Sequence, residues 1–264
     1  MLLIKDNDTL NIDSGFNSYE INSDTDINLN LNLKNDCDLF IRINKVKNLN
    51  INASISGKSS IVFWNDSNDS INAIENYDVI NDGDLTLAYG ECNDGITKRK
   101  LDVNLKDKNT NALVASASLV SNKKNYQIYV INENLKTSGN IKNFAVILEN
   151  GDLMIDAVGK IVKGAKRSKS HQVSRALSFK ENQKATILPE LLIDENDVEA
   201  SHAMSIGRVD EKHLYYMMSR GLNINDCTKL ISLGYLLPIT EYINNEELSN
   251  TLKEELERKI VSNV

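Results

Sequence analysis

The chain has 264 residues, of which 41% are hydrophobic and 25% charged, a balance typical of a folded protein rather than a disordered one. Its formal net charge of -7 argues against nucleic-acid binding, which relies on an excess of lysine and arginine. No apolar run is long enough to cross a bilayer, so no membrane partner is expected. The three cysteines, Cys37, Cys92 and Cys227, form neither a CxxC pair nor a disulfide framework, which favours a reducing, cytoplasmic environment.

From about residue 3 to residue 193, apolar and polar residues alternate in short segments. The alternation is strict at residues 27–33 and recurs at residues 84–89, 101–105 and 126–130. Apolar residues at every second position place one face of a strand inward and the other outward. Clusters of Asn, Asp, Gly and Ser separate the segments, so the pattern predicts many short strands joined by turns and no long helix between them.

Two all-β architectures fit this pattern. One is an antiparallel sandwich, and the other is a β-helix, in which each coil of the chain stacks on the previous one. Small residues on the inward face, such as Ala115, Ala117 and Ala145, and asparagine in the turns favour the β-helix. No clean internal repeat is present, so the pattern alone leaves both architectures open.

Past the last of these strands, the period changes from two to that of a helix. Asp210 can start a first helix, and Gly221 is a plausible residue to end it. A second helix follows, and residues 246–261 carry leucine or isoleucine at intervals of four, which predicts an amphipathic third helix. The sequence therefore predicts a strand domain over residues 1–203 and a helical subdomain over residues 204–264.

Familiar catalytic signatures are missing: the sequence has no glycine-rich phosphate loop, no G-x-S-x-G elbow and no H-E-x-x-H motif. Only His171, His202 and His213 could serve a Ser-His-Asp site, and nothing nearby supports one. A β-helical carbohydrate-active enzyme or glycan-binding protein is an alternative, because such proteins use clustered acids and exposed aromatic residues. Asp82 and Asp84 are close together, but an Asp-Gly-Asp segment is most often a turn.

Five segments in the second half of the chain carry spaced motifs. They read GKIVKGAKRS at 159–168, HQVSRALS at 171–178, LPELLI at 188–193, DVEASHA at 197–203 and LYYMMSRGL at 214–222. These segments resemble, in order, the patterns G-x-I-x-x-G-A-x-x-(S/T), Q-x-x-R/N-x-L-L, x-P-x-L-x-I, D-V-x-x-S-H-G/A and (L/I)-F-Y-L-x-S-R-G-I of the SUF iron–sulfur cluster scaffolds, the SufB/SufD family. The resemblance is strong over about residues 155–240. Upstream of it, only the all-β character agrees.

The resemblance implies a right-handed parallel β-helix followed by a C-terminal helical subdomain, and a scaffold rather than an enzyme. It also implies two partners, namely a SufC-like ABC ATPase and a second scaffold subunit, which is either another copy of this chain or a different SufB/SufD-type protein. ATP hydrolysis would reside in the ATPase. The tail from Asp210 onwards would be the ATPase dock, with these partner-binding residues: Leu214, Tyr215, Tyr216, Arg220, Gly221, Leu230 and Leu233.

For the site itself, the resemblance places His202 on the histidine that both scaffold types share, and imidazole is a sound iron ligand. From the residues alone, a lone histidine at this junction is more often a structural hydrogen-bonding residue than a ligand. Ser174 occupies the position of the cluster-building cysteine in SufB-type chains, and a hydroxyl is a far poorer ligand than a thiolate. The chain is therefore expected to be SufD-like, with at most a transient iron–sulfur cluster and none bound stably.

Overall fold

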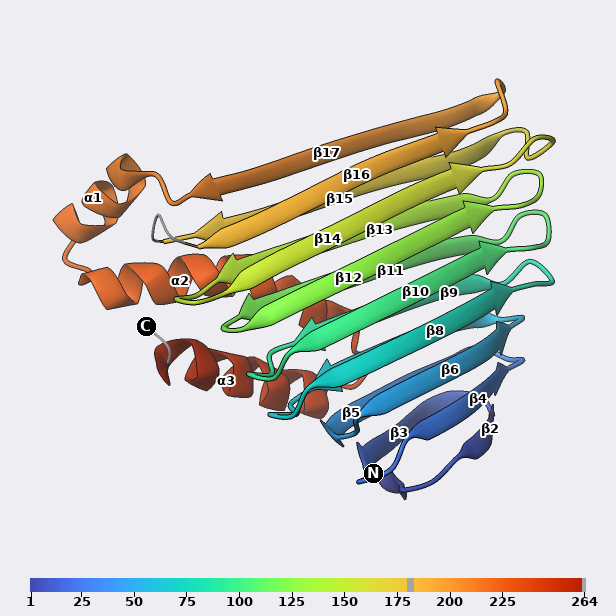
Figure 1. The fold of residues 1–264 in the computed structure, drawn as a ribbon, viewed down its shortest axis with the longest axis horizontal. Coiled ribbons are helices and arrows are strands. Elements are labelled where there is room, and N and C mark those ends of the chain that lie inside the picture. Colours follow the sequence, from blue (N-terminus) through green and yellow to red (C-terminus); the bar gives the residue numbers. More distant parts are fainter. Residues whose placement is uncertain (180–182, 263–264) are drawn as a thin grey trace.

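The structure is a computed structural model that describes residues 1–179 and 183–262. Most of this part of the chain forms a nine-stranded sheet and an eight-stranded sheet that lie face to face (Figure 1). The odd-numbered sheet contains β1 (Leu2–Ile4), β3 (Gly15–Asn22), β5 (Cys37–Lys45), β7 (Lys58–Asn65), β9 (Asp84–Glu91), β11 (Asn111–Val120), β13 (Ser138–Ile147), β15 (Ser168–Ser178) and β17 (Val198–Arg208). The even-numbered sheet contains β2 (Asp8–Ile12), β4 (Ile27–Leu33), β6 (Asn48–Ile55), β8 (Ile71–Val79), β10 (Thr97–Leu105), β12 (Lys123–Asn132), β14 (Asp152–Ile161) and β16 (Lys184–Ile193).

Consecutive strands alternate between the two sheets, and neighbours within a sheet are parallel and lie two strands apart in sequence. Each coil therefore contributes one strand to each sheet, which confirms the predicted parallel β-helix and excludes the antiparallel sandwich. The coil length varies along the stack. Stacked residues are 22 positions apart at Asn28 and Asn50 but 31 apart at Asn143 and Ser174, which explains why no fixed repeat is visible in the sequence.

The strict alternation of β4 shows how the two faces of a strand are used. Its leucines and isoleucine point inward and are fully buried, whereas its asparagines point outward. Stacking aligns these outward asparagines with those of the next coil, so that the Asn50 amide donates to Asn28 over 2.9 Å and the Asn32 amide donates to Asn11 over 2.9 Å. Side-chain ladders of this kind are one structural reason for the many asparagines in this chain.

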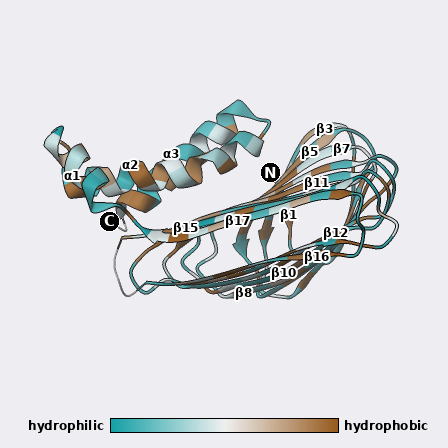
Figure 2. Cartoon of the chain, turned by 90° about the horizontal axis from the view of Figure 1, so that it is seen from above, coloured by the Kyte–Doolittle hydropathy of each residue, from teal (hydrophilic) through white to brown (hydrophobic). Residues whose placement is uncertain are grey.

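The C-terminal part forms α1 (Glu211–Ser219), α2 (Ile224–Leu236), the 3-10 helix η1 (Leu237–Tyr242) and α3 (Glu246–Ser262), so the predicted helical tail is confirmed. The side chains of Asp210 and Asn223 cap α1 and α2. All of these helices lie on the side of the odd-numbered sheet (Figure 2). Among the described residues, none of them combines the length and the apolar character that crossing a bilayer requires. Strand β17 runs through residue 203 to Arg208, and the division into two domains stays a prediction.

α2, η1 and α3 cover the outer face of the odd-numbered sheet. Leu252, Leu256 and Ile260 of α3 are fully buried and belong to one apolar cluster with Trp64 on β7. Trp64 fits because its register neighbour is Gly90, where a Cβ atom would lie 2.3 Å from the indole ring. The tail is therefore anchored to the β-helix by a second hydrophobic core.

Charged contacts add to this anchor at the same surface. The guanidinium of Arg42 on β5 lies 2.6 Å from the carboxylate of Glu255 and 3.5 Å from that of Asp66. Lys259 contacts Asp66 at 3.3 Å and donates to the backbone carbonyl of Cys92 over 2.7 Å. The contacts of Glu255 and Lys259 fix the position of α3 along the sheet, because they join the helix to different coils.

Four charged side chains lie between the two sheets, in the middle coils. The Arg99 guanidinium contacts Glu75 and lies 2.5 Å from the Glu91 carboxylate. The Lys124 ammonium donates to Asn93 and to Gly95 O and Thr97 Oγ1, both at 3.2 Å. Two acids and two bases balance each other, as buried charges require.

Burial disfavours the charged forms in this cluster. It lowers the pKa of Lys124 to about 8, although the nearby carboxylate of Glu91 opposes the shift, and it raises the pKa of Glu91. An unfolded lysine has a pKa near 10.4. Between pH 8 and about 10.4 the unfolded chain therefore binds a proton at Lys124 that the folded chain has released.

We predict that this difference makes part of the stability of the protein depend on pH. The free energy of unfolding of the wild type, relative to that of Lys124→Met, should rise between pH 8 and pH 10 by at most about 1.4 kcal/mol per pH unit. Urea unfolding at a series of pH values measures both proteins. Parallel pH profiles for the two proteins would contradict the assignment of the shift to Lys124.

Candidate functional site

The β-helix ends in an open edge. β17 pairs only with β15, and β16 pairs only with β14, so within the described chain no strand pairs with their outer edges. Side chains that would point into the core of a longer stack are exposed here, and Met204 and Ile206 on β17 are 47% and 43% exposed. Leu188 and Leu192 on β16 are also exposed, but they lie on the outer face of the even-numbered sheet, beside Asp156 and Lys160 of β14. An unpaired edge with apolar side chains is a surface that invites another strand.

His202 lies on this edge, at the middle of β17. Its register neighbour on β15 is Gln172, and two residues further on Met204 pairs with Ser174. Residues two apart on a strand share a face, so His202 and Met204 point to the same side, the one on which Gln172 and Ser174 lie. The structure thus brings the two residues singled out for chemistry, His202 and Ser174, onto neighbouring strands.

Ser174 differs from His202 in its exposure. His202 is exposed, whereas Ser174 is 1% exposed and its hydroxyl accepts from the Asn143 amide over 3.1 Å. Asn143 in turn accepts from the Ser116 hydroxyl over 2.7 Å. This row of polar side chains crosses three neighbouring strands inside the β-helix and ends below Met204. Ser174 is therefore shielded from solvent, and reagents reach it only if β17 moves away from β15.

Two residues at this edge were not predicted from the sequence as site residues. Met204 places a thioether beside His202, and Gln172 is a buried glutamine whose Nε2 donates to the backbone carbonyl of Glu190 on β16 over 2.8 Å. The period-two pattern could have found them, because it puts residues 202 and 204 on one face. Which residues of β15 lie beside them, however, depends on the strand register, and the register cannot be derived from the sequence alone.

Thiolates are not available at this edge. Cys37, Cys92 and Cys227 are all buried elsewhere, and burial raises the pKa of Cys37 and raises that of Cys92 to about 12. Over residues 1–179 and 183–262, no three His, Cys, Asp or Glu side chains converge as a metal site. Within this described part of the chain, His202 is therefore not one of a converging set of such side chains.

Immediately after β17, α1 extends beyond the ends of the strands (Figure 1). The helix buries none of its residues, and Tyr215 and Tyr216 are 76% and 58% exposed. The Arg220 guanidinium lies over the Tyr216 ring, 5.2 Å from its centre. Gly221 has a φ of +95°, the left-handed conformation that ends helices and that glycine adopts without strain. Four of the predicted dock residues thus gather on an exposed helix and its C-terminal turn.

The other predicted dock residues behave differently. Leu214 on α1 is half-buried, and Leu230 on α2 is exposed. Leu233 packs against the odd-numbered sheet and belongs to the anchor of the tail. A groove of about 470 Å³ lies between α1, α2 and the end of β17, lined by these residues: Leu177, Arg208, Val209, Asp210, His213, Tyr216, Met217, Ile231 and Tyr235.

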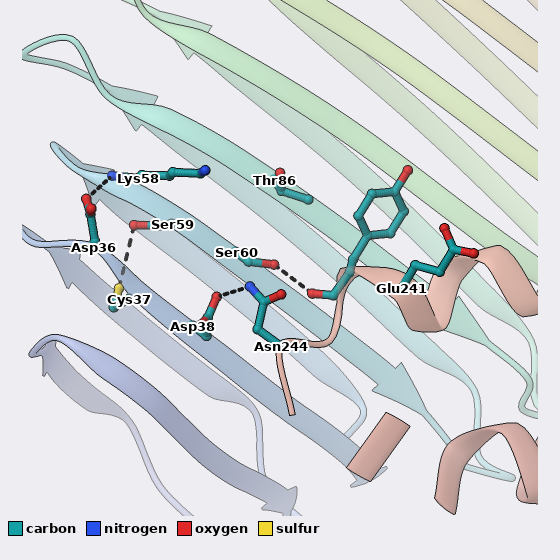
Figure 3. Close-up of a pocket in the computed structure, with 10 residues that line it drawn as sticks. Asp36, Cys37, Asp38, Lys58, Ser59, Ser60, Thr86, Glu241 and Asn244 are labelled. Atoms are coloured by element: carbon teal, nitrogen blue, oxygen red, sulfur yellow. Dashed lines mark hydrogen bonds between the residues drawn. The ribbon is translucent and has the colours of Figure 1, made fainter. Parts of the chain in front are cut away.

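A second cleft, of about 320 Å³, lies far from His202, where η1 meets β5 and β7 (Figure 3). Several of its polar groups form hydrogen bonds with each other. The Asn244 amide donates to Asp38 over 2.7 Å, and the Ser60 hydroxyl donates to the carbonyl of Tyr242 over 2.9 Å. These bonds hold η1 on the sheet, so the cleft serves the attachment of the tail.

The features that suggested a carbohydrate-binding β-helix give that alternative no support. Trp64, the single tryptophan, is buried beneath the helical tail instead of being exposed to stack on a sugar. Asp82 has a φ of 56° in the turn between β8 and β9, and its carboxylate accepts from the Asn109 amide over 2.8 Å. The Asp-Gly-Asp segment is therefore a turn.

Comparison with known proteins identifies the family of this chain. Residues 46–235 match the family model of the SufBD core domain, which is described as SUF system FeS cluster assembly. The chain belongs to the SufBD family. It is 32% identical to the iron–sulfur cluster assembly protein SufD of Bacillus subtilis over 181 residues, 68% of this chain and 41% of the relative.

Two further relatives extend this result to other organisms. A SufBD family protein of Pyrococcus horikoshii is 36% identical over 85 residues, 32% of this chain and 19% of the relative. SufD of Escherichia coli is 23% identical over 103 residues, 39% of this chain and 24% of the relative. The alignments of this chain thus span less than half the length of each of these three relatives.

The difference in exposure between Ser174 and His202 leads to a test by thiol labelling. We predict that Ser174→Cys reacts with a maleimide at least tenfold more slowly than His202→Cys, because residue 174 is buried below the edge. The three native cysteines are buried and give a low background. Mass spectrometry of the labelled protein measures both rates. Equal rates would show that residue 174 is open to solvent.

Proposed function

We propose that this chain is a scaffold subunit in iron–sulfur cluster assembly. In this proposal it binds a SufC-like ABC ATPase through α1, and it pairs with a second SufBD-type subunit through the open edge of its β-helix. The observation that carries the proposal is that one continuous segment holds both surfaces. β17 bears His202 on an unpaired edge, and only Val209 and Asp210 separate it from the exposed helix α1.

The open edge of β17 favours pairing with a strand of a second subunit. Free backbone N–H and C=O groups along β17, flanked by exposed Met204 and Ile206, match the requirements of strand addition, in which main-chain hydrogen bonds give affinity and side chains give specificity. The second subunit is another copy of this chain or a different SufBD protein. It would supply the thiolates that this edge lacks.

In the proposed site the iron–sulfur cluster is cargo, assembled and passed on, and no group is expected to stay bound. His202 would contribute an imidazole nitrogen, a good ligand for iron. The chain itself would act as a scaffold, and the energy of ATP hydrolysis would come from the partner bound at α1. No membrane or nucleic acid takes part in this scheme, and we place it in the cytoplasm.

The arrangement also suggests how the two surfaces communicate. α2 and α3 are fixed to the odd-numbered sheet by the Trp64 cluster and by the ion pairs of Arg42 and Lys259, whereas α1 has no buried residue. A movement of the ATPase on α1 would therefore be transmitted through residues 209 and 210 to β17. The anchored helices would keep the rest of the tail in place.

The dock is tested by replacing its most exposed aromatic residues. We expect Tyr215→Ala combined with Tyr216→Ala to weaken binding of the SufC-like ATPase at least tenfold, because buried tyrosines at interfaces carry 1–3 kcal/mol or more. Calorimetric titration of the full chain measures the affinity. Tyr129→Ala, on the outer face of the even-numbered sheet, is the control and should bind as the wild type does. Unchanged affinity in the double variant would exclude α1 as the dock.

The ligand role is tested at His202. His202→Ala should fold and bind the ATPase like the wild type, because the side chain is exposed, but the iron and sulfide content of the anaerobically reconstituted complex should fall several-fold. His171→Ala is the matched control, since His171 lies on the opposite face of the sheet and bonds to Ser201 at 2.7 Å. Equal iron and sulfide in the His202 variant and the wild type would rule out the ligand role.

A further inference from the structure

The carboxamide of Gln172 is only half satisfied, although the residue is 1% exposed. Its Nε2 donates to the Glu190 carbonyl on β16 over 2.8 Å, which fixes the plane of the amide across the interior of the β-helix. Its Oε1 has no hydrogen-bond partner. Because leaving a buried acceptor unpaired is costly, an oxygen held in this way points to a donor that completes it.

The surroundings of Gln172 are built to hold this side chain. Gly159 on β14 lies against it, and a Cβ atom there would come within 2.9 Å of Gln172 Nε2 and 2.3 Å of Ser170 Oγ. Any other residue at position 159 would push the amide out of its place. The glycine thus keeps open the space that the glutamine fills.

Only one of the two register neighbours of Gln172 can donate a hydrogen bond from its side chain. On β13 the neighbour is Ile141, which is apolar and buried, and on β17 the neighbour is His202. Paired residues on adjacent strands are about 4.8 Å apart. The structure has no hydrogen bond between the two side chains, but His202 is exposed, so a rotation of its side chain can bring an imidazole N–H to Gln172 Oε1. The Ser170 hydroxyl, also without a partner, is the competing donor.

We propose that Gln172 is a positioning residue for His202: its Oε1 accepts the N–H of the imidazole and thereby fixes both the tautomer and the direction of the ring. A neutral imidazole has one N–H and one nitrogen with a free lone pair. When one nitrogen is bound to Gln172, the other faces the open edge of β17 and is ready to bind a metal. The inference rests on the proposed function, because it explains how His202 would be prepared as a ligand.

Second partners of this kind are a general feature of histidine ligands, whose other ring N–H is usually held by a carboxylate or a carbonyl oxygen. Here the partner would come from the neighbouring coil, one strand below the edge. The ligand would therefore be oriented before any cluster arrives, and the contact would form in the isolated chain once the imidazole turns toward Gln172. The contact can therefore be tested with neither iron nor the other subunits.

The test is the tautomeric state of His202 in the isolated chain. The protein has three histidines, so ¹⁵N-histidine labelling gives a simple spectrum, and the signals of His202 are those lost in His202→Gln. Long-range ¹H–¹⁵N correlation at pH 8 distinguishes the ring nitrogen that carries the proton. We expect one tautomer of His202 in the wild type, both tautomers in Gln172→Met, and one tautomer again in Gln172→Glu, which restores an acceptor oxygen.

Gln127→Met, at an exposed glutamine on the outer face of β12, is the matched control and should leave His202 unchanged. Circular dichroism checks that each variant is folded, and Gln172→Glu covers the case in which Gln172→Met does not fold. A mixture of tautomers in the wild type, or a His202 spectrum unaffected by Gln172→Met, would overturn the inference and leave Ser170 as the donor to Gln172.

The tautomer and the iron content separate this inference from the proposed function. If Gln172 orients the ligand, Gln172→Met should also lower the iron and sulfide of the reconstituted complex several-fold, and Gln172→Glu should restore them. If the tautomer of His202 changes in Gln172→Met but His202→Ala keeps its full iron and sulfide, the ligand role is refuted and the Gln172 contact stands. If the tautomer of His202 is unchanged in Gln172→Met but His202→Ala loses iron and sulfide, only the Gln172 contact is refuted.

Discussion

In a parallel β-helix each strand is held by backbone hydrogen bonds to the strands of the coils before and after it. Within the described residues, this chain satisfies that requirement from β3 to β15 in one sheet and from β4 to β14 in the other, and leaves it unsatisfied at β1 and β2 at one end and at β16 and β17 at the other. The last coil therefore exposes both its backbone and the side chains that would otherwise face a further coil. The proposed pairing with a second subunit and the proposed roles of His202 and Gln172 depend on this unsatisfied end.

The interior of the last coils carries a row of buried polar side chains on β15. Gln172 stands where β13 has Ile141 and β11 has Val114. Ser174 continues the polar row of Asn143 and Ser116, and His202 follows Gln172 at the edge. Buried polar groups cost stability unless they are paired, so a row of them beside an open edge is expected to serve a purpose other than packing. The charged cluster around Arg99 is balanced and closed to solvent, and its role is structural.

The sequence could predict the strands, because period-two alternation is a local property. It could not decide whether the strands are parallel, because the register depends on contacts 22 to 31 residues apart and the coil length varies. The sequence also contains a sign that the outer face of the odd-numbered sheet is covered. Residues 61–64, Ile-Val-Phe-Trp, are apolar on both faces of the strand, and such a strand must be buried on both sides. Position 202 was found only through the motifs around it, whereas Gln172 and Met204 needed the register.

For the helical tail, too, the sequence predicts the elements but not their contacts. Its helices were predictable from caps and spacing, but the sequence did not show that Leu233 faces the sheet while Tyr215 and Tyr216 face solvent. That division decides which part of the tail is free to bind, and it arises because α2 and α3 share one core with Trp64. The proposed roles of the tail, anchor and dock, are therefore assigned by packing and not by helix propensity.

Hydrogen–deuterium exchange tests the central claim most directly, because it reports on the backbone of the edge itself. The isolated chain is compared with the complete assembly that contains the ATPase and the second scaffold subunit. The account predicts that amides of β17 that face away from β15 exchange at least tenfold more slowly in the assembly, whereas those of β11, which has neighbours on both sides, do not change. Equal exchange at β17 in both samples would contradict the claim that this edge is where the subunits join.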